Sequence, residues 1–189
     1  NEHVRGLWRR TSLESYRTTE PQWEVLLDLD KLSEAEGKNW VYKGAQCRWP
    51  AYDRCLISLS DGGKDAVTVR EFDVASKRFV DDGFVLPEGK QDVAWEGPDT
   101  LLVAREWGPG TMTSSGYAFV VKRLKRGQPL DQAVEVFRGT QTDVGASPLV
   151  LHDGDGNTAV VFARNVTFYE SETWIDTPAG PKKLAVPAK

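Results

Sequence analysis

Short apolar segments bounded by turn residues recur along this chain at a nearly constant interval. Cys55–Ser60, Leu101–Ala104 and Thr158–Ala163 each open a run of three predicted strands, and a fourth strand precedes each run. Equivalent strands lie about 50 residues apart, a spacing typical of the four-stranded blades of a β-propeller. The interval predicts an all-β architecture with very little helix.

The residue types within the strands also favour blades. Leu101–Ala104 and Ala159–Ala163 are apolar throughout, as expected for inner strands that neighbouring blades cover on both faces. Val69–Asp73 and Val121–Arg126 mix apolar with charged residues, as expected for outer strands. A two-sheet β-sandwich that binds a small molecule is the alternative architecture. The repeat favours the propeller.

The repeat divides the chain into a lead-in and about three antiparallel blades. We expect a lead-in strand and a short helix in residues 1–37, followed by blades in residues 38–88, 89–140 and 141–189. The helix is expected to end at Gly37, because glycine suits the position just past a helix end. Closed propellers have about four to eight blades, so the chain is expected to be part of a propeller.

Charge and hydropathy argue against two classes of partner. The 24 Lys and Arg residues stand against 28 Asp and Glu residues, with a formal net charge of −4 and a pI near 5.3. No nucleic-acid partner is expected, since that would need a basic surface. No apolar run approaches the roughly 20 residues that cross a bilayer, so no membrane partner is expected.

The first residues lack the apolar stretch of a secretory signal. This absence says little, and we expect a cytoplasmic protein. A periplasmic location is the alternative, since the chain does not begin with Met.

Three polar features suggest a site, and each has a simpler interpretation. Asp153–Asn157 alternates oxygen ligands as a calcium loop does, but it lacks the Gly and Glu that such a loop needs, and it predicts a hairpin turn. Cys47 and Cys55 flank the turn at Pro50–Asp53 and are expected to be two free thiols in a reducing compartment. His152 is interpreted as a loop histidine, because no motif places a nucleophile beside it.

Several tryptophans could in principle form a carbohydrate-binding surface. They are scattered over strands and turns, and we expect them to pack between blades instead. The residues concerned are Trp8, Trp40, Trp49, Trp95 and Trp107. No catalytic, cofactor-binding or metal-binding residue is assigned, and no cofactor is expected.

A series of short motifs occurs in an order that resembles the propeller of bacterial prolyl oligopeptidase-family serine peptidases. The resemblance runs from about Val4 to Phe137 and weakens after Thr142. It is carried by Arg5–Thr11, Ser15–Arg17, Trp23–Asp28, Glu36–Val41, Ser58–Gly63, Arg70–Asp73, Gly83–Glu88 and Lys122–Gly127.

This resemblance implies a two-domain serine-type prolyl endopeptidase. An α/β-hydrolase domain would carry the Ser, Asp and His triad, and a seven-bladed propeller would admit only short, unfolded peptides for cleavage after proline. The triad serine sits in a G-x-S-x-G elbow, which this sequence lacks. Thr113–Gly116 is the nearest Ser-Gly segment, and it precedes a predicted strand where a helix is needed.

The chain is therefore expected to be a non-catalytic propeller fragment that gates peptide access to a hydrolase domain. A stand-alone propeller-type interaction or scaffold module is the alternative function. The expected partners are the hydrolase domain, peptide substrates and a second copy of the chain. The second copy would join through cut blade faces that carry Leu56, Leu102, Val121 and Val160.

Overall fold

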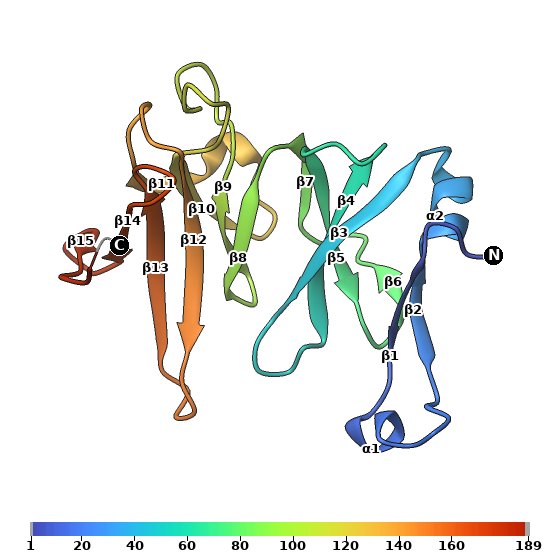
Figure 1. The fold of residues 1–189 in the computed structure, drawn as a ribbon. Helices are drawn as coiled ribbons and strands as arrows, with labels where there is room; N and C mark the ends of the chain where they lie inside the picture. The colour runs from blue at the N-terminus through green and yellow to red at the C-terminus, as the bar shows by residue number, and fades with distance from the viewer. Residues whose placement is uncertain (1, 188–189) are drawn as a thin grey trace. The chain divides into compact units, whose positions relative to one another are not determined.

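Strands dominate the computed structural model of this chain, which describes residues 2–187 (Figure 1). The backbone groups into two units, Asn1–Ala45 with Tyr52–Glu88 and Gln46–Ala51 with Gly89–Lys189. The expectation of an all-β chain with very little helix is confirmed. None of the helices in the described part of the chain has the length and apolar character that a membrane crossing needs.

The first unit contains a two-stranded sheet and most of a five-stranded sheet. The small sheet pairs β1 with β2, and the larger one has the order β3-β4-β5-β6, with β7 also pairing with β5. The elements are β1 (Leu7–Arg10), α1 (Leu13–Tyr16), β2 (Glu24–Asp28), α2 (Leu29–Glu36), β3 (Trp40–Cys47), β4 (Arg54–Asp61), β5 (Val67–Asp73), β6 (Arg78–Phe79) and β7 (Val85–Gly89). The sequence pattern had not predicted β1 and β7.

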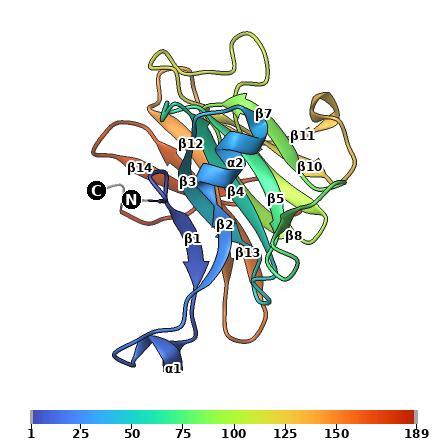
Figure 2. The ribbon, with the colours of Figure 1, turned by 90° about the vertical axis from the view of Figure 1, so that its right-hand side faces the viewer.

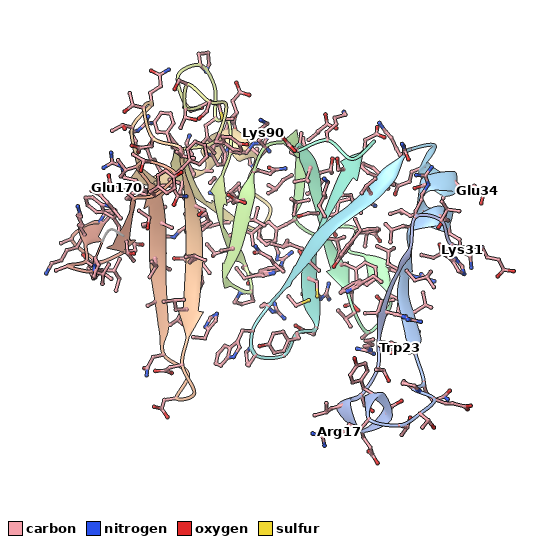
Figure 3. All side chains as sticks on the ribbon, viewed as in Figure 1. Arg17, Trp23, Lys31, Glu34, Lys90 and Glu170 are labelled. Atoms are coloured by element: carbon pink, nitrogen blue, oxygen red, sulfur yellow. The ribbon has the colours of Figure 1, made fainter. Side chains whose placement is uncertain are left out.

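The helix α2 begins and ends where its capping residues dictate. The Asp28 carboxylate accepts hydrogen bonds from the backbone N–H groups of Asp30 (3.0 Å) and Lys31 (3.2 Å) at the N-terminus. Gly37 adopts φ 62° at the other end, which confirms the expected helix end. Lys31 and Glu34 project from the exposed side of α2 (Figure 3).

The β1–β2 hairpin extends as an arm with α1 at its tip (Figure 2). The guanidinium of Arg9 lies 4.2 Å from the ring centroid of Trp23. Trp23 also meets Tyr16 edge to face, with 6.1 Å between ring centroids. These contacts tie α1 to the two strands, although no residue of α1 is buried.

The second unit contains two four-stranded antiparallel sheets, ordered β11-β10-β9-β8 and β12-β13-β14-β15. Its elements are β8 (Asp92–Gly97), β9 (Thr100–Ala104), β10 (Val120–Lys125), the short 3₁₀ helix η1 (Leu130–Gln132), β11 (Val134–Arg138), β12 (Gly145–His152), β13 (Thr158–Asn165), β14 (Ser171–Ile175) and β15 (Lys182–Lys183). Figure 1 shows the β8–β9 turn and the β12–β13 hairpin directed toward the same end of this unit.

One apolar cluster joins these two sheets. It includes Leu102 of β9, Val121 of β10, Phe137 of β11 and Phe162 of β13. The rings of Phe137 and Phe162 are stacked, with centroids 4.8 Å apart. The β9 residues Leu101–Ala104 are all 0% exposed, which confirms that this strand is covered on both faces.

The residues expected on cut blade faces do not lie there. Leu56, Leu102 and Val121 are at most 1% exposed, and Val160 packs against the apolar cluster of the second unit. Inner strands are apolar on both faces, so their composition alone does not reveal which face remains uncovered. The exposed aliphatic side chains of the last sheet are instead Leu149 and Leu151 of β12.

The expectation of two free thiols is wrong. Cys47 and Cys55 are both disulfide-bonded, and the chain has two cysteines. They stand at the end of β3 and the start of β4, the positions that a hairpin brings opposite each other. The sequence analysis had identified this proximity. The expectation of free thiols rested on the general rule that neighbouring thiols stay reduced in a reducing compartment, and not on the geometry of the hairpin.

Candidate functional site

A pocket of about 380 Å³ opens between three turns of the second unit. We call it the Trp49 pocket. The β3–β4 turn, the β8–β9 turn and the base of the β12–β13 hairpin contribute its walls. Its lining residues are Arg48, Trp49, Pro50, Ala51, Trp95, Glu96, Gly97, Pro98, His152 and Thr158.

A stacked aromatic pair forms one wall of the Trp49 pocket. The rings of Trp49 and His152 lie 4.5 Å apart and are parallel to within 10°. The His152 Nδ1 atom lies 3.2 Å from the Thr158 hydroxyl oxygen across the hairpin. The contact with Thr158 helps to orient the imidazole ring, on which the indole of Trp49 stacks.

Trp95 also lines the Trp49 pocket and is buried. It is 7% exposed, and its indole N–H donates a hydrogen bond of 2.9 Å to the backbone carbonyl of Gln46. The guanidinium of Arg48 lies 5.9 Å from the centroid of the Trp95 ring. The two indoles are thus supported by different strands, Trp49 by His152 of β12 and Trp95 by Gln46 of β3.

The one carboxylate in the lining is neutralised by a neighbour. Both oxygens of Glu96 accept hydrogen bonds of 2.6 Å from Arg123, which also donates one of 2.8 Å to Asp176. The hydrogen bonds from Arg123 to Glu96 have the largest effect on its pKa. Together with the bond to Asp176 they outweigh burial and raise the pKa of Arg123. Glu96 therefore adds no unmatched negative charge to the Trp49 pocket.

The Asp153–Asn157 segment is a hairpin turn, as its sequence predicted. The Asp153 carboxylate accepts hydrogen bonds from the backbone N–H groups of Asp155 (2.9 Å) and Asn157 (2.8 Å), and from the Asn157 amide (2.7 Å). The Asn157 side chain contributes most to lowering the pKa of Asp153. The turn's own donors occupy the oxygens that a calcium ion would need.

His3, Asp28 and Asp30 bring three ligand atoms within 4.8 Å of one another in the first unit. Asp28 already caps α2, and its second oxygen lies 3.2 Å from His3 Nδ1. Asp30 accepts a hydrogen bond of 2.9 Å from the backbone N–H of Arg5. These bonds account for both carboxylates structurally, and we assign no metal here.

The two histidines and the Thr113–Gly116 segment are the residues that could have suggested a hydrolase site, and none of the described contacts brings them together. Among residues 2–187, His3 contacts Asp28, and His152 contacts Thr158 and Trp49. The Thr113–Gly116 segment is a turn, with the Thr113 and Ser115 hydroxyls 3.2 Å apart. The described contacts thus pair neither histidine with a serine or cysteine.

Most of the tryptophans considered for carbohydrate binding instead pack within the protein, as expected. Trp8 contacts Tyr42 and Phe72, and Trp40 is buried with its N–H bonded to Glu36. The indole of Trp107 donates to the backbone carbonyl of Val120. Trp49 differs from these three because it lines the Trp49 pocket.

Residues 1–184 match the family described as prolyl oligopeptidase, N-terminal β-propeller domain. The chain belongs to this family. The resemblance inferred from the sequence is confirmed, and the sheets of this prolyl oligopeptidase propeller are part of a β-propeller.

Curated relatives of this prolyl oligopeptidase propeller are named as peptidases. An uncharacterized peptidase of Sinorhizobium fredii is 57% identical over 171 residues, which cover 90% of this chain and 24% of that protein. An uncharacterized peptidase of Rickettsia prowazekii is 33% identical over 184 residues, covering 93% of this chain and 26% of the relative. The chain thus spans about a quarter of the length of the curated relatives it matches.

Solved structures agree with this placement. A post-proline cleaving enzyme from Rickettsia typhi superposes with a TM-score of 0.88 at 33% identity, over 100% of this chain and 29% of that one. Oligopeptidase B from Leishmania major gives a TM-score of 0.63 at 14% identity, over 94% of this chain and 25% of the other. This second likeness concerns the fold alone.

Proposed function

We propose that this chain is the propeller portion of a post-proline-cleaving serine peptidase, and that it restricts the access of peptides to an α/β-hydrolase domain carried elsewhere on the same polypeptide. The similarity to the Rickettsia typhi post-proline cleaving enzyme carries this proposal. The peptidase names of the curated relatives, and the share of them that this chain spans, support it.

The two sheets of the second unit are closely packed against each other, and such rigidity is needed to restrict the access of large substrates. The shared apolar cluster joins its two sheets, and Arg123 of β10 bridges to Asp176 just beyond β14. Closely packed sheets deform little, so they do not move apart to admit a bulky substrate. A flexible peptide can pass such a wall in extended form, whereas a folded domain would first have to unfold.

The test of this function uses the longer polypeptide that carries the chain. We expect it to cleave a short Gly-Pro reporter peptide. When the same Gly-Pro sequence lies inside a stably folded domain, we expect kcat/KM to fall by at least about a hundredfold, or about 2.7 kcal/mol in activation free energy. Equal cleavage of both substrates would contradict the gating role.

The isolated chain supplies the control for this test. We expect it neither to release the reporter nor to react with a serine-directed fluorophosphonate, because it lacks the nucleophile elbow. Stoichiometric labelling of any of its serines would show that the chain has its own catalytic centre.

We further propose that the isolated chain self-associates through one face of its last sheet. The strand register places Leu149 opposite Val161, and Val161 opposite Ile175, on a single face. Leu149 is 47% exposed and Leu151, two residues further along the same face, is 54% exposed. This apolar face suits a further blade of the longer polypeptide, and a second copy could cover it in the isolated chain.

Replacing both Leu149 and Leu151 by lysine should convert a dimer of the isolated chain to a monomer. Covering about 500 Å² of apolar surface contributes about 12 kcal/mol, against association costs of about 4–15 kcal/mol. Light scattering should give about twice the chain mass of 21.1 kDa for the unmodified chain and 21.1 kDa for the double variant. Val134→Lys on β11, where the side chain is 62% exposed, is the matched control and should remain dimeric. A monomeric unmodified chain would refute the self-association.

A further inference from the structure

The Trp49 pocket contains hydrogen-bonding groups that the protein itself does not use. Within residues 2–187, no partner lies within hydrogen-bonding distance of the indole N–H of Trp49 or of Nε2 of His152. By contrast, the indole N–H groups of Trp40, Trp95 and Trp107 donate to acceptors of the chain. A packing role therefore accounts for those three indoles, whereas the N–H of the partly exposed Trp49 is accessible to a ligand.

The lining of the Trp49 pocket combines apolar side chains with Arg48, Thr158 and the paired carboxylate of Glu96. Trp49 supplies an aromatic surface, Trp95 adds the small part of its ring that is exposed, and Pro50, Ala51 and Pro98 supply small apolar surfaces. A volume of about 380 Å³ lies within the range of roughly 300–1,000 Å³ for small-ligand pockets. The pocket suits a ligand with flat apolar rings and a hydrogen-bond acceptor between them.

A proline-containing peptide in the polyproline II conformation has this chemistry. Its pyrrolidine rings pack against aromatic faces, and its backbone carbonyls point outward with no internal hydrogen bonds. Proline has no backbone N–H, so the bound segment would bring few donors that need a partner. Aromatic-lined grooves that bind such segments do so with little ordering cost, because the extended conformation is already formed.

From these observations we infer that the Trp49 pocket binds a short proline-containing peptide segment in the polyproline II conformation. The ring of Trp49 and the apolar surfaces of Pro50 and Pro98 contact the prolines, and the Trp49 N–H donates to a peptide carbonyl. His152 holds the Trp49 ring in place through their stacked contact. The inference concerns binding at the turns of the second unit and does not depend on any catalytic activity of the longer polypeptide.

The test measures binding of a decaproline peptide by calorimetry to the longer polypeptide that carries this chain. The protein is first treated with a serine-directed fluorophosphonate, so that turnover cannot consume the peptide. We expect saturable binding of decaproline and none of a Gly-Ser peptide of equal length. Trp49→Ala should weaken decaproline binding at least about tenfold, because it removes both the ring face and the donor.

Two further variants separate recognition from folding. Trp49→Phe keeps an aromatic ring but removes the N–H, and should weaken binding about threefold to tenfold, the range expected for one net hydrogen bond. Trp23→Ala removes a tryptophan that is 40% exposed at the β1–β2 arm of the first unit (Figure 3), and should leave binding unchanged.

Three results would overturn the inference. These are no binding of decaproline to the unmodified protein, equal binding by Trp49→Ala, and binding of cellohexaose in place of decaproline, which would indicate a sugar site. Reporter hydrolysis by untreated protein is measured separately, so failure of the peptide site and failure of the proposed peptidase function remain distinguishable.

Discussion

Replacing Asp143 by asparagine is expected to lower the free energy of unfolding by about 3–5 kcal/mol, the cost of breaking a buried ion pair by removing one partner. Asp143 is 3% exposed. Its carboxylate accepts hydrogen bonds from Arg164 Nε (2.7 Å) and Nη2 (3.0 Å), and from the Thr140 backbone N–H and hydroxyl (both 2.7 Å). An asparagine amide would turn its own N–H groups toward some of these donors, and among the described residues Arg164 would keep only Glu172, 3.2 Å from its Nη1 atom, as a counter-charge.

Asp99→Asn provides the matched control for this change. Asp99 also pairs with an arginine, with 2.7 Å between its carboxylate and Arg126, but its side chain is 72% exposed. Because solvent screens this pair, Asp99→Asn should lower the free energy of unfolding by less than about 1 kcal/mol. Urea unfolding of the two variants checks the difference. Equal losses would show that burial is not what makes the Asp143 pair important.

The Asp143 effect should also depend on pH. Burial raises the pKa of this carboxyl, but the hydrogen bonds from Arg164 and Thr140 outweigh burial and leave it below its ordinary value of 3.8. A lowered folded-state pKa means that the stabilisation is present above the unfolded pKa and is lost as pH falls through the folded one. The stability difference between Asp143→Asn and the unmodified chain should therefore be constant near neutral pH and shrink below pH 3.8. A difference that persists unchanged in acid would contradict the ion-pair explanation.

The features predicted well from the sequence depend on residues close together in the chain. Leu101–Ala104 is fully buried. Four consecutive apolar residues place apolar side chains on both faces of the strand, so both faces favour burial. Gly37 ends α2, and Asp153 closes the β12–β13 hairpin through donors within four residues of it. In each case the local chemistry and the final fold favour the same structure.

The features that the sequence missed depend on residues that are distant along the chain. Trp49 and His152 stack although about a hundred residues separate them, and no local pattern indicates their contact. Asp143, in the turn before β12, reaches Arg164 of β13 in the same way. A Trp-Pro turn and a histidine at a strand end are signals that could have drawn attention to the Trp49 pocket, but only a tertiary contact between separate sheets joins them.

Phe162→Ala should also destabilise the protein by about 3–5 kcal/mol, through loss of buried apolar surface and creation of a cavity. Phe162 is 0% exposed, and its ring stacks on that of Phe137, which in turn lies 5.7 Å from the Trp174 ring. Removing the ring leaves Phe137 without its stacked partner in the cluster that joins the two sheets of the second unit. The neighbours come from different strands and cannot close the space without moving a sheet.

Phe168→Ala is the matched control, since it makes the same substitution in the turn between β13 and β14. Phe168 is 88% exposed, so its loss should change the free energy of unfolding by no more than about 0.5 kcal/mol. Denaturant unfolding followed by tryptophan fluorescence measures both variants, because Trp174 lies beside the altered cluster. A loss below about 1 kcal/mol for Phe162→Ala would mean that the second unit collapses around the vacancy. The two sheets would then be joined by something other than this cluster.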